Sequence, residues 1–288
     1  MSRNQATLAG SGTGGGMSVC LSYEGSGAVR SMAVFNSTFI SNRAAAVGGG
    51  ALYVRVEDGG GMPMAAEVRG CTFRGNWAAA TVAGEAGEAD GGAVLLFPTP
   101  GFTATTLADS VFEGNSAADT GGAVALRVEG TSSYGALHVT NCSFRGNVAH
   151  GSGGGALSVV KPTNNDVPLT LLRIAGGSRF LNNSCGGIDS AGGGAVYTPG
   201  VERVDIAGGI EFSSNAAAFG SGGALFLGSP TSVSVSDAVF SSNRAPTGDG
   251  GVICVRSELL AVDSVVLGPN VTARSNSANN GTLVGCEA

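Results

Sequence analysis

Lysine is almost absent from this chain of 288 residues, in which Lys161 stands against 14 arginines and only 12% of residues are charged. The arginines are scattered along the sequence, and the formal net charge is −6. Binding to nucleic acid requires a basic stripe that neutralises phosphates. The composition therefore predicts no nucleic-acid partner.

Long apolar runs and long helical patterns are also missing. No run approaches the roughly 18 apolar residues that a membrane-spanning helix needs, and no stretch reads as a helix of ten or more residues. The first 16 residues contain no basic region followed by an apolar one, so no secretion signal is visible. We expect an all-β chain without a transmembrane segment.

Glycine, in contrast, accounts for 50 of the 288 residues. Collagen requires glycine at every third position, and no such period occurs. Disordered chains combine low hydrophobicity with high charge, whereas 43% of these residues are hydrophobic. The glycines therefore occur at intervals in a folded, apolar chain.

Two short motifs alternate along nearly the whole sequence. One is Gly-Gly-Ala followed by an apolar residue, with Val252 once in place of alanine. The other is Phe-x-x-Asn, whose asparagines, including degenerate copies at both ends, recur at intervals of between 28 and 39 residues. We call equivalent residues of successive repeats a column. The complete copies of this motif define a phenylalanine column and an asparagine column, at Phe39/Asn42, Phe73/Asn76, Phe112/Asn115, Phe144/Asn147, Phe180/Asn183, Phe212/Asn215 and Phe240/Asn243.

Each repeat contains two strand-like runs. Apolar residues alternate after Gly-Gly-Ala, as at Leu52, Val54 and Val56, and a second run precedes each Phe-x-x-Asn motif. Alternation of this kind with β-branched residues predicts half-buried strands. Turn-forming residues separate the second run from the phenylalanine, at Asn36, Gly70, Asp109, Asn141 and Asp237.

Repeats without helices are typical of a propeller or a solenoid. A propeller blade needs four strands with tight hairpins, whereas these columns favour turns that stack about 4.8 Å apart, like on like. We therefore predict a single-stranded parallel β-helix (a β-solenoid) of about eight turns, with residues 1–288 as one domain. Phenylalanine would fill the interior, Gly-Gly would allow positive φ, and asparagine would tolerate a left-handed bend and bond the backbone of the next turn.

The paired motifs, as in Phe39-Ile-Ser-Asn42 and Gly49-Gly-Ala-Leu52, resemble the repeat of the polymorphic outer-membrane proteins of obligate intracellular bacteria. The resemblance covers nearly the whole chain. It implies a right-handed, pectin-lyase-like β-helix that is displayed outside the cell and acts in adhesion. The handedness rests on this resemblance alone.

The chain begins and ends in the middle of a turn. Met1 occupies the phenylalanine column, and Ala288 follows directly on a strand. Solenoids cover their end faces with capping units, and neither end shows one. We expect a domain that is uncapped at both ends and belongs to a longer protein, with end-on stacking or flanking domains.

Polysaccharide lyases and hydrolases on β-helices need carboxylates clustered on one face. The best candidate pair is Asp90 and Asp119, which lie on adjacent turns near one loop that also contains Glu85 and Glu88. Solvated loop charge is the favoured interpretation of this cluster, with a catalytic pair as the alternative. We expect no dedicated catalytic residue, no bound metal and no cofactor.

The histidines and cysteines show no metal-site spacing. His138 and His150 are the only histidines, and no Cys-x-x-Cys motif occurs among the six cysteines. Cys71 and Cys142 share a column but lie two turns apart, about 9.6 Å, which is too far for a disulfide. A disulfide between Cys254 and Cys286 is left open.

Five glycosylation sequons occur, where about three would arise by chance in a chain with 17 asparagines. This surplus favours a secreted eukaryotic protein. We expect a glycoprotein that lies outside the cell or at the cell surface. The candidate sites are Asn36, Asn141, Asn270 and Asn280, while Asn182 lies beside the asparagine column and is expected to be inaccessible.

Insertions at Gly59–Met64, Thr81–Asp90 and Lys161–Pro168 interrupt the repeats. Solenoids bind partners through such one-sided loops. Trp77, the only tryptophan, is expected to pack as loop core, with an outward sugar-binding position as the alternative. The sequence predicts a non-catalytic module that binds a glycan or a surface protein through its loops. The alternative is a polysaccharide lyase or glycoside hydrolase.

Overall fold

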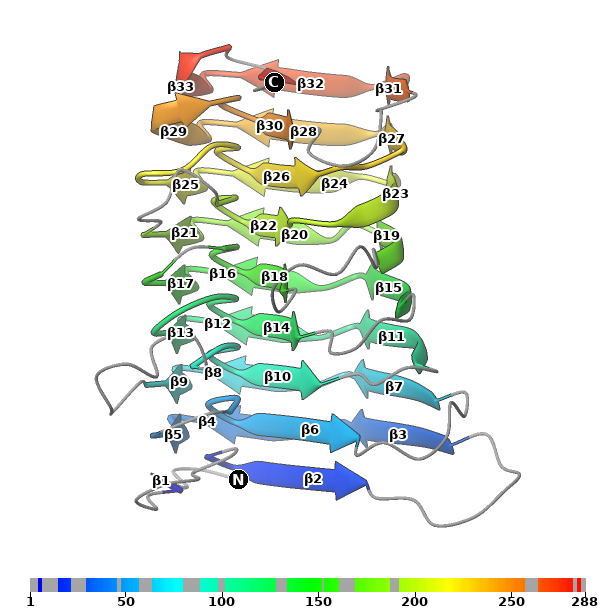
Figure 1. Cartoon of the computed structure of the whole chain (residues 1–288), viewed down its shortest axis with the longest axis vertical. Helices are drawn as coiled ribbons and strands as arrows, with labels where there is room; N and C mark the ends of the chain where they lie inside the picture. Colours follow the sequence, from blue (N-terminus) through cyan, green and yellow to red (C-terminus); the bar gives the residue numbers. More distant parts are fainter. Residues whose placement is uncertain are drawn as a thin grey trace.

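The computed structural model describes residues 5–6, 15–21, 30–45, 48–56, 64–79, 89–97, 102–127, 134–151, 153–160, 169–186, 192–256, 264–281 and 284–285. These residues form an all-β parallel solenoid, and no helix occurs among them. The turns stack one on another from the N-terminal to the C-terminal end of a rod (Figure 1). Four parallel sheets of nine, nine, eight and eight strands run along this rod, which gives eight complete turns of four strands.

Two of the sheets were expected from the alternating runs. Sheet C follows the Gly-Gly-Ala motifs and contains β2 (Met17–Leu21), β6 (Leu52–Val56), β10 (Val94–Phe97), β14 (Val124–Arg127), β18 (Leu157–Val160), β22 (Val196–Thr198), β26 (Leu225–Gly228), β30 (Ile253–Arg256) and β34 (Val284–Gly285). Sheet D contains β3 (Arg30–Phe35), β7 (Met64–Arg69), β11 (Phe102–Ala108), β15 (Tyr134–Thr140), β19 (Leu169–Ala175), β23 (Val201–Ile206), β27 (Ser232–Val235) and β31 (Ser264–Leu267).

Two further sheets were not expected, because most of their strands are only two to four residues long. Sheet A carries the phenylalanine column in β4 (Thr38–Ile40), β8 (Thr72–Arg74), β12 (Val111–Glu113), β16 (Ser143–Arg145), β20 (Arg179–Leu181), β24 (Ile210–Ser213), β28 (Ala238–Ser241) and β32 (Val271–Arg274). Sheet B follows the asparagines in β1 (Gln5–Ala6), β5 (Arg43–Ala44), β9 (Trp77–Ala78), β13 (Ser116–Ala117), β17 (Val148–Ala149), β21 (Ser184–Cys185), β25 (Ala216–Ala217), β29 (Arg244–Asp249) and β33 (Ser277–Asn280). Each repeat therefore has four strands rather than two.

The phenylalanine column forms one continuous stack inside the rod. Its rings lie with neighbouring centroids between 4.7 and 5.1 Å apart and with planes within 10° of parallel. All members of the column are buried: Phe39, Phe73, Phe112, Phe144, Phe180, Phe212 and Phe240. Burying one such side chain contributes roughly 1.5–3 kcal/mol before entropy is counted, so this stack is a main part of the core.

The asparagine column forms a buried hydrogen-bond ladder. In Asn147, Oδ1 accepts from the backbone N and the Nδ2 of Asn115, both at 3.0 Å. Its Nδ2 donates to Phe112 O at 3.0 Å and to Asn183 Oδ1 at 2.9 Å. Every polar atom of the side-chain amide is thus used between adjacent turns.

The same arrangement recurs at the other rungs. The Nδ2 atoms of Asn76, Asn215 and Asn243 donate to Oδ1 of the asparagine in the next turn, at 2.9, 2.9 and 3.0 Å. They also donate to the phenylalanine carbonyl of the preceding turn, at 3.0, 2.9 and 3.0 Å. The whole column is buried: Asn42, Asn76, Asn115, Asn147, Asn183, Asn215 and Asn243.

This pattern corrects the expected direction of the asparagine bonds. The amide was expected to bond the backbone of the next turn. It instead bonds the backbone of the preceding turn, while the next turn is reached through the asparagine side chain, as between Asn215 and Asn243. Parallel stacking explains this, because each inward amide lies in line with the amides above and below it.

The backbone conformation at this corner also differs from the expectation. The left-handed residue is the one before each asparagine, such as Ser41 or Gly75, with φ between 53° and 60° in the complete repeats. The asparagine side chain can then point inward and bond along the rod axis. At the other corner, the expected turn formers Asn36, Asp109 and Asn141 do take positive φ.

The two glycines of each Gly-Gly pair serve different purposes. The first takes positive φ in four repeats, as at Gly121 (φ 63°), in agreement with the expectation. The second is required for space: a Cβ on Gly122 would lie 2.1 Å from Gly155 O and 2.5 Å from the backbone of Val148 in β17. The start and the end of one turn therefore meet backbone to backbone.

Removal of one rung of the ladder tests its contribution to stability. We expect Asn147→Ala to lower the free energy of unfolding by about 3 kcal/mol, because several buried donors and acceptors lose their partners. The exposed corner variant Asn141→Gly keeps a left-handed residue and should change stability by less than about 0.5 kcal/mol. Urea denaturation followed by circular dichroism measures both, and equal effects would contradict a stabilising role for the ladder.

A pair of glycine variants separates space from backbone strain. Gly146 has φ 60° and nothing within 4 Å of a Cβ, so Gly146→Ala should cost about 1 kcal/mol. Gly122→Ala should cost about 3 kcal/mol, because two backbones must move apart. Thermal unfolding of both proteins decides this, and a smaller effect at Gly122 would show that the turns separate easily there.

Candidate carboxylate site

Asp90 is the last residue before the Gly91-Gly92 pair that leads into β10, and its side chain is completely buried. Thr120 holds the same position in the next turn, because the Gly91 N donates to Thr120 O. The threonine Oγ1 and N both donate to Asp90 Oδ1, at 2.9 and 3.2 Å. One carboxylate oxygen is thus held by the neighbouring turn.

The other oxygen of Asp90 pairs with an arginine from sheet C. Arg127, at the end of β14, places Nη1 at 3.2 Å from Asp90 Oδ2, and its side chain is only 16% exposed. The guanidinium carbon lies 5.8 Å from the ring centroid of Phe97. Burial raises the pKa of Asp90, and Arg127 and Thr120 partly offset this.

Asp119 is the second member of the predicted pair and is half-buried. Its N donates to Ala89 O at 3.2 Å, next to Asp90. A Cβ on Gly151 would lie 2.3 Å from Asp119 Oδ1, so the glycine in the next turn leaves space for this carboxyl. Burial and repulsion from Asp90 raise the pKa of Asp119 to about 7, with Arg127 acting in the opposite direction.

The structure therefore brings the two predicted aspartates together. It also corrects the favoured interpretation of solvated loop charge, because Asp90 is buried and Asp119 is half-buried. The pKa of both carboxyls is raised, and perturbed pKa values of this kind are common at catalytic sites. A glycosidase, however, needs both carboxyl groups beside the scissile bond, whereas Asp90 is buried and both of its oxygens are occupied. Only Asp119 could reach a ligand, so this geometry fits an internal clamp between turns.

The asparagine column contributes no group to a surface site. Asn76, Asn215 and Asn243 are 0% exposed, and their amides are bonded to the neighbouring turns. A ligand would have to separate two turns to reach them. Their role is therefore confined to holding the solenoid together.

Further members of the predicted cluster, Glu85 and Glu88, lie outside the described residues. Within the described part of the chain, no group of three or more His, Cys, Asp or Glu side chains could hold a metal ion. His138 on β15 is half-buried, and burial together with Arg173 lowers its pKa. His150 is exposed and places Nε2 3.1 Å from Ser116 Oγ.

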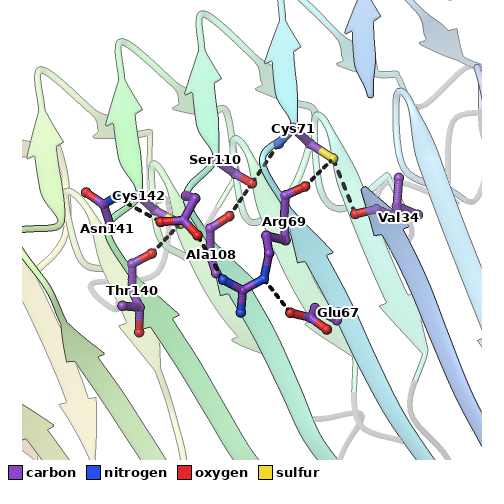
Figure 2. Close-up of polar contacts among 10 residues, drawn as sticks. Val34, Glu67, Arg69, Cys71, Ala108, Ser110, Thr140, Asn141 and Cys142 are labelled. Carbon is purple, nitrogen blue, oxygen red and sulfur yellow. Dashed lines mark hydrogen bonds and ion pairs between the residues drawn. The ribbon is translucent and has the colours of Figure 1, made fainter. Parts of the chain in front are cut away.

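Four of the cysteines, Cys71, Cys142, Cys185 and Cys254, are buried packing residues, whereas Cys20 is exposed. Cys71 and Cys142 are free, as their separation predicts, and Ser110 lies between them in one column (Figure 2). Ser110 Oγ accepts from Cys71 N at 3.1 Å and donates to Ala108 O at 2.7 Å, while the Cys142 thiol donates to Thr140 O at 3.3 Å. Burial raises the pKa of Cys142 to about 12, as it does for Cys185. Cys286 lies outside the described residues.

Three of the four candidate glycosylation residues share one corner of the solenoid. Asn36, Asn141 and Asn270 are exposed and left-handed, with φ of 47°, 51° and 58°. In Figure 2, Asn141 lies at this corner, where its Nδ2 donates to Asp109 Oδ1 at 2.8 Å. The fourth, Asn280, is exposed in β33.

This corner explains the surplus of sequons without reference to glycosylation. A left-handed position favours Asn, Asp or Gly, the next residue is small, and the one after it is an outward strand residue that is often Ser or Thr. The fold therefore generates Asn-x-Ser/Thr by itself. Asn182 is also left-handed, at φ 55°, but at the other corner, directly before Asn183, and it is exposed rather than inaccessible as expected.

Trp77 corrects one expectation. It lies on β9 with 41% of its surface exposed, rather than packing as loop core. Its neighbour Ala78 is fully buried, so the alternation of the strand turns the indole outward. The predicted binding loops at 81–88 and 161–168, and most of 59–64, lie outside the described residues.

Comparison with known proteins gives one match. Residues 109–126 match the family model of the Chlamydia polymorphic membrane protein repeat. No curated protein and no solved structure matches the chain significantly. In the described residues, no helix has the length and apolar character needed to cross a membrane. The match and the parallel solenoid agree with the resemblance seen in the sequence, and the right-handed, pectin-lyase-like form stays a prediction.

The raised pKa of Asp119 predicts a pH dependence of stability. Asp119 keeps its proton up to about pH 7 in the folded state, whereas its reference pKa is 3.8. Its contribution to the free energy of unfolding is therefore fully present below the reference pKa and is lost as pH rises through 7. We expect the melting temperature to fall between about pH 5 and about pH 8, and Asp119→Asn to remove most of this fall. Calorimetry at both pH values measures it.

Asp90→Asn serves as the contrasting variant, since it leaves Arg127 buried without its carboxylate. It should lower the melting temperature at both pH values, because an uncompensated buried charge is costly. A wild-type melting temperature that is constant between the two pH values would contradict the interpretation of Asp119.

Proposed function

We propose that this chain is a non-catalytic β-helix module displayed at the cell surface, where it binds a glycan or a surface protein. The observation that carries the proposal is the repeat itself: residues 109–126 match a repeat of a membrane protein family, and the same turn recurs along the rod. The interior polar groups of this turn are used to hold neighbouring turns together. The outer faces and loops are left for recognition.

The carboxylate pair supports a binding module more than an enzyme. Asp90 is committed to Thr120 and Arg127, so one half of any acid–base pair is missing from the surface. A second candidate function, a polysaccharide lyase or glycoside hydrolase, is favoured only by the pKa of about 7 at Asp119. In that case the partner group would have to come from another part of the surface.

The proposal includes flanking domains or end-on stacking at the end faces of the solenoid. Val265 and Leu267 in β31 are 38% and 40% exposed, whereas Val233 and Val235 in the same columns of the preceding turn are buried. Flanking domains or end-on stacking would cover such apolar side chains. Glycosylation at Asn36, Asn141, Asn270 or Asn280 also stays a prediction.

One experiment separates the two functions. The purified chain is applied to a glycan array and to intact host cells, and the same protein is incubated with a panel of neutral and acidic polysaccharides. We expect saturable binding and neither new reducing ends nor unsaturated products. Asp119→Asn, which keeps the shape of the side chain, should leave the binding unchanged.

Product formation that Asp119→Asn abolishes would overturn the proposal in favour of the enzyme. Absence of binding to every surface and glycan would remove the adhesive function. Heat-denatured protein is the control for non-specific adsorption in the binding arm.

A further inference from the structure

Trp77 stands out on the outer face of sheet B. It is the only tryptophan of the chain, and it is 41% exposed on a strand that is paired with both neighbouring turns. The same column holds Arg43 in the preceding turn and Ser116 in the following one. Strand pairing fixes these three positions to steps of roughly 4.8 Å.

The arginine gives the indole a charged partner. The guanidinium carbon of Arg43 lies 4.2 Å from the ring centroid of Trp77, which is a close cation–π contact. The Nε of Arg43 is buried and has no hydrogen-bond partner. This nitrogen is closed to solvent and to a ligand alike, so a ligand would have to meet the outer nitrogens of this half-buried side chain. A guanidinium prefers a carboxylate or a similar oxyanion as its acceptor.

The following turns add further hydrogen-bonding groups. Ser116 Oγ lies 3.1 Å from Nε2 of His150, and this imidazole is exposed. The face thus presents, in order along the rod, a cation, an aromatic plate, a hydroxyl and an imidazole. Among the described residues, no carboxylate forms an ion pair with Arg43.

We propose that Arg43, Trp77, Ser116 and His150 form a binding site for an acidic saccharide. The apolar face of a sugar ring stacks on the face of the indole that Arg43 does not cover. Its carboxylate or sulfate reaches past the edge of the indole to accept from the outer nitrogens of Arg43, and a hydroxyl of the next sugar bonds to Ser116 or His150. Because the groups follow the rod axis, the saccharide lies along the stacked turns. The inference rests on the proposed function and narrows its ligand class.

The single tryptophan makes the test direct, because its fluorescence reports on this site alone. Titration with a defined oligogalacturonate or a sulfated oligosaccharide should shift or quench the emission, and added salt should weaken binding. A neutral cello-oligosaccharide of equal length should bind at least roughly tenfold more weakly, since it lacks the charged acceptor.

Matched variants assign the roles. Arg43→Gln should weaken binding of the acidic saccharide roughly tenfold or more while binding of the neutral one stays the same. Arg244→Gln is the control, because Arg244 is exposed and holds the same column several turns away, in β29. Phe219→Ala is the aromatic control, since Phe219 is 62% exposed. Both controls should bind like the wild type.

Calorimetry measures the variants that lack tryptophan. Trp77→Ala should lose binding at least roughly tenfold, and Trp77→Phe should retain part of it. Unchanged far-ultraviolet circular dichroism shows that the variants are folded. Binding to the glycan array that is unaffected by Trp77→Ala and Arg43→Gln would overturn this site and leave the proposed function standing. Equal binding of an acidic peptide would show that charge alone is recognised, and would overturn the site as well.

Discussion

The buried asparagine ladder is the interaction on which the rest of the solenoid depends. Each side-chain amide bonds to both neighbouring turns, as Asn147 does to Asn115 and Asn183. These bonds have a fixed length, so they fix the pitch of the coil and allow no slip of one turn against the next. The phenylalanine stack at 4.7 to 5.1 Å follows from the same pitch. Because the asparagine ladder sets the register once in each turn, it also aligns all the remaining columns.

The columns could be predicted from the sequence because each turn repeats the same physical demands. Sheets A and B could not, because a strand of two or three residues is too short to show alternation. The steric requirement for the second glycine of each Gly-Gly pair could not be predicted from the sequence either, for a different reason. Gly122 meets Val148 in β17, which lies much later in the chain, and only the closed turn brings the two backbones together.

The candidate carboxylate site also has some features that could be predicted from the sequence and others that could not. Asp90 and Asp119 were placed on adjacent turns from their distance to the motifs, and the structure places them together. The partner Arg127 was missed because it is an outward residue of sheet C, a position on which the repeat puts no demand. The orientation of Trp77 could have been found, since Ala78 occupies a core column and the residue before it must point outward.

Motif counts in a repeat protein carry less information than in other chains. The sequons at Asn36, Asn141 and Asn270 arise at one left-handed corner, so the conformation of that corner is enough to explain their number. The same reasoning gives weight to residues that depart from their column. Trp77 is the one aromatic residue among the described members of its column, which include Arg43, Ser116 and Val148. Arg43 stacks on one face of the indole, but the ring is still 41% exposed, so its function is best sought outside the coil.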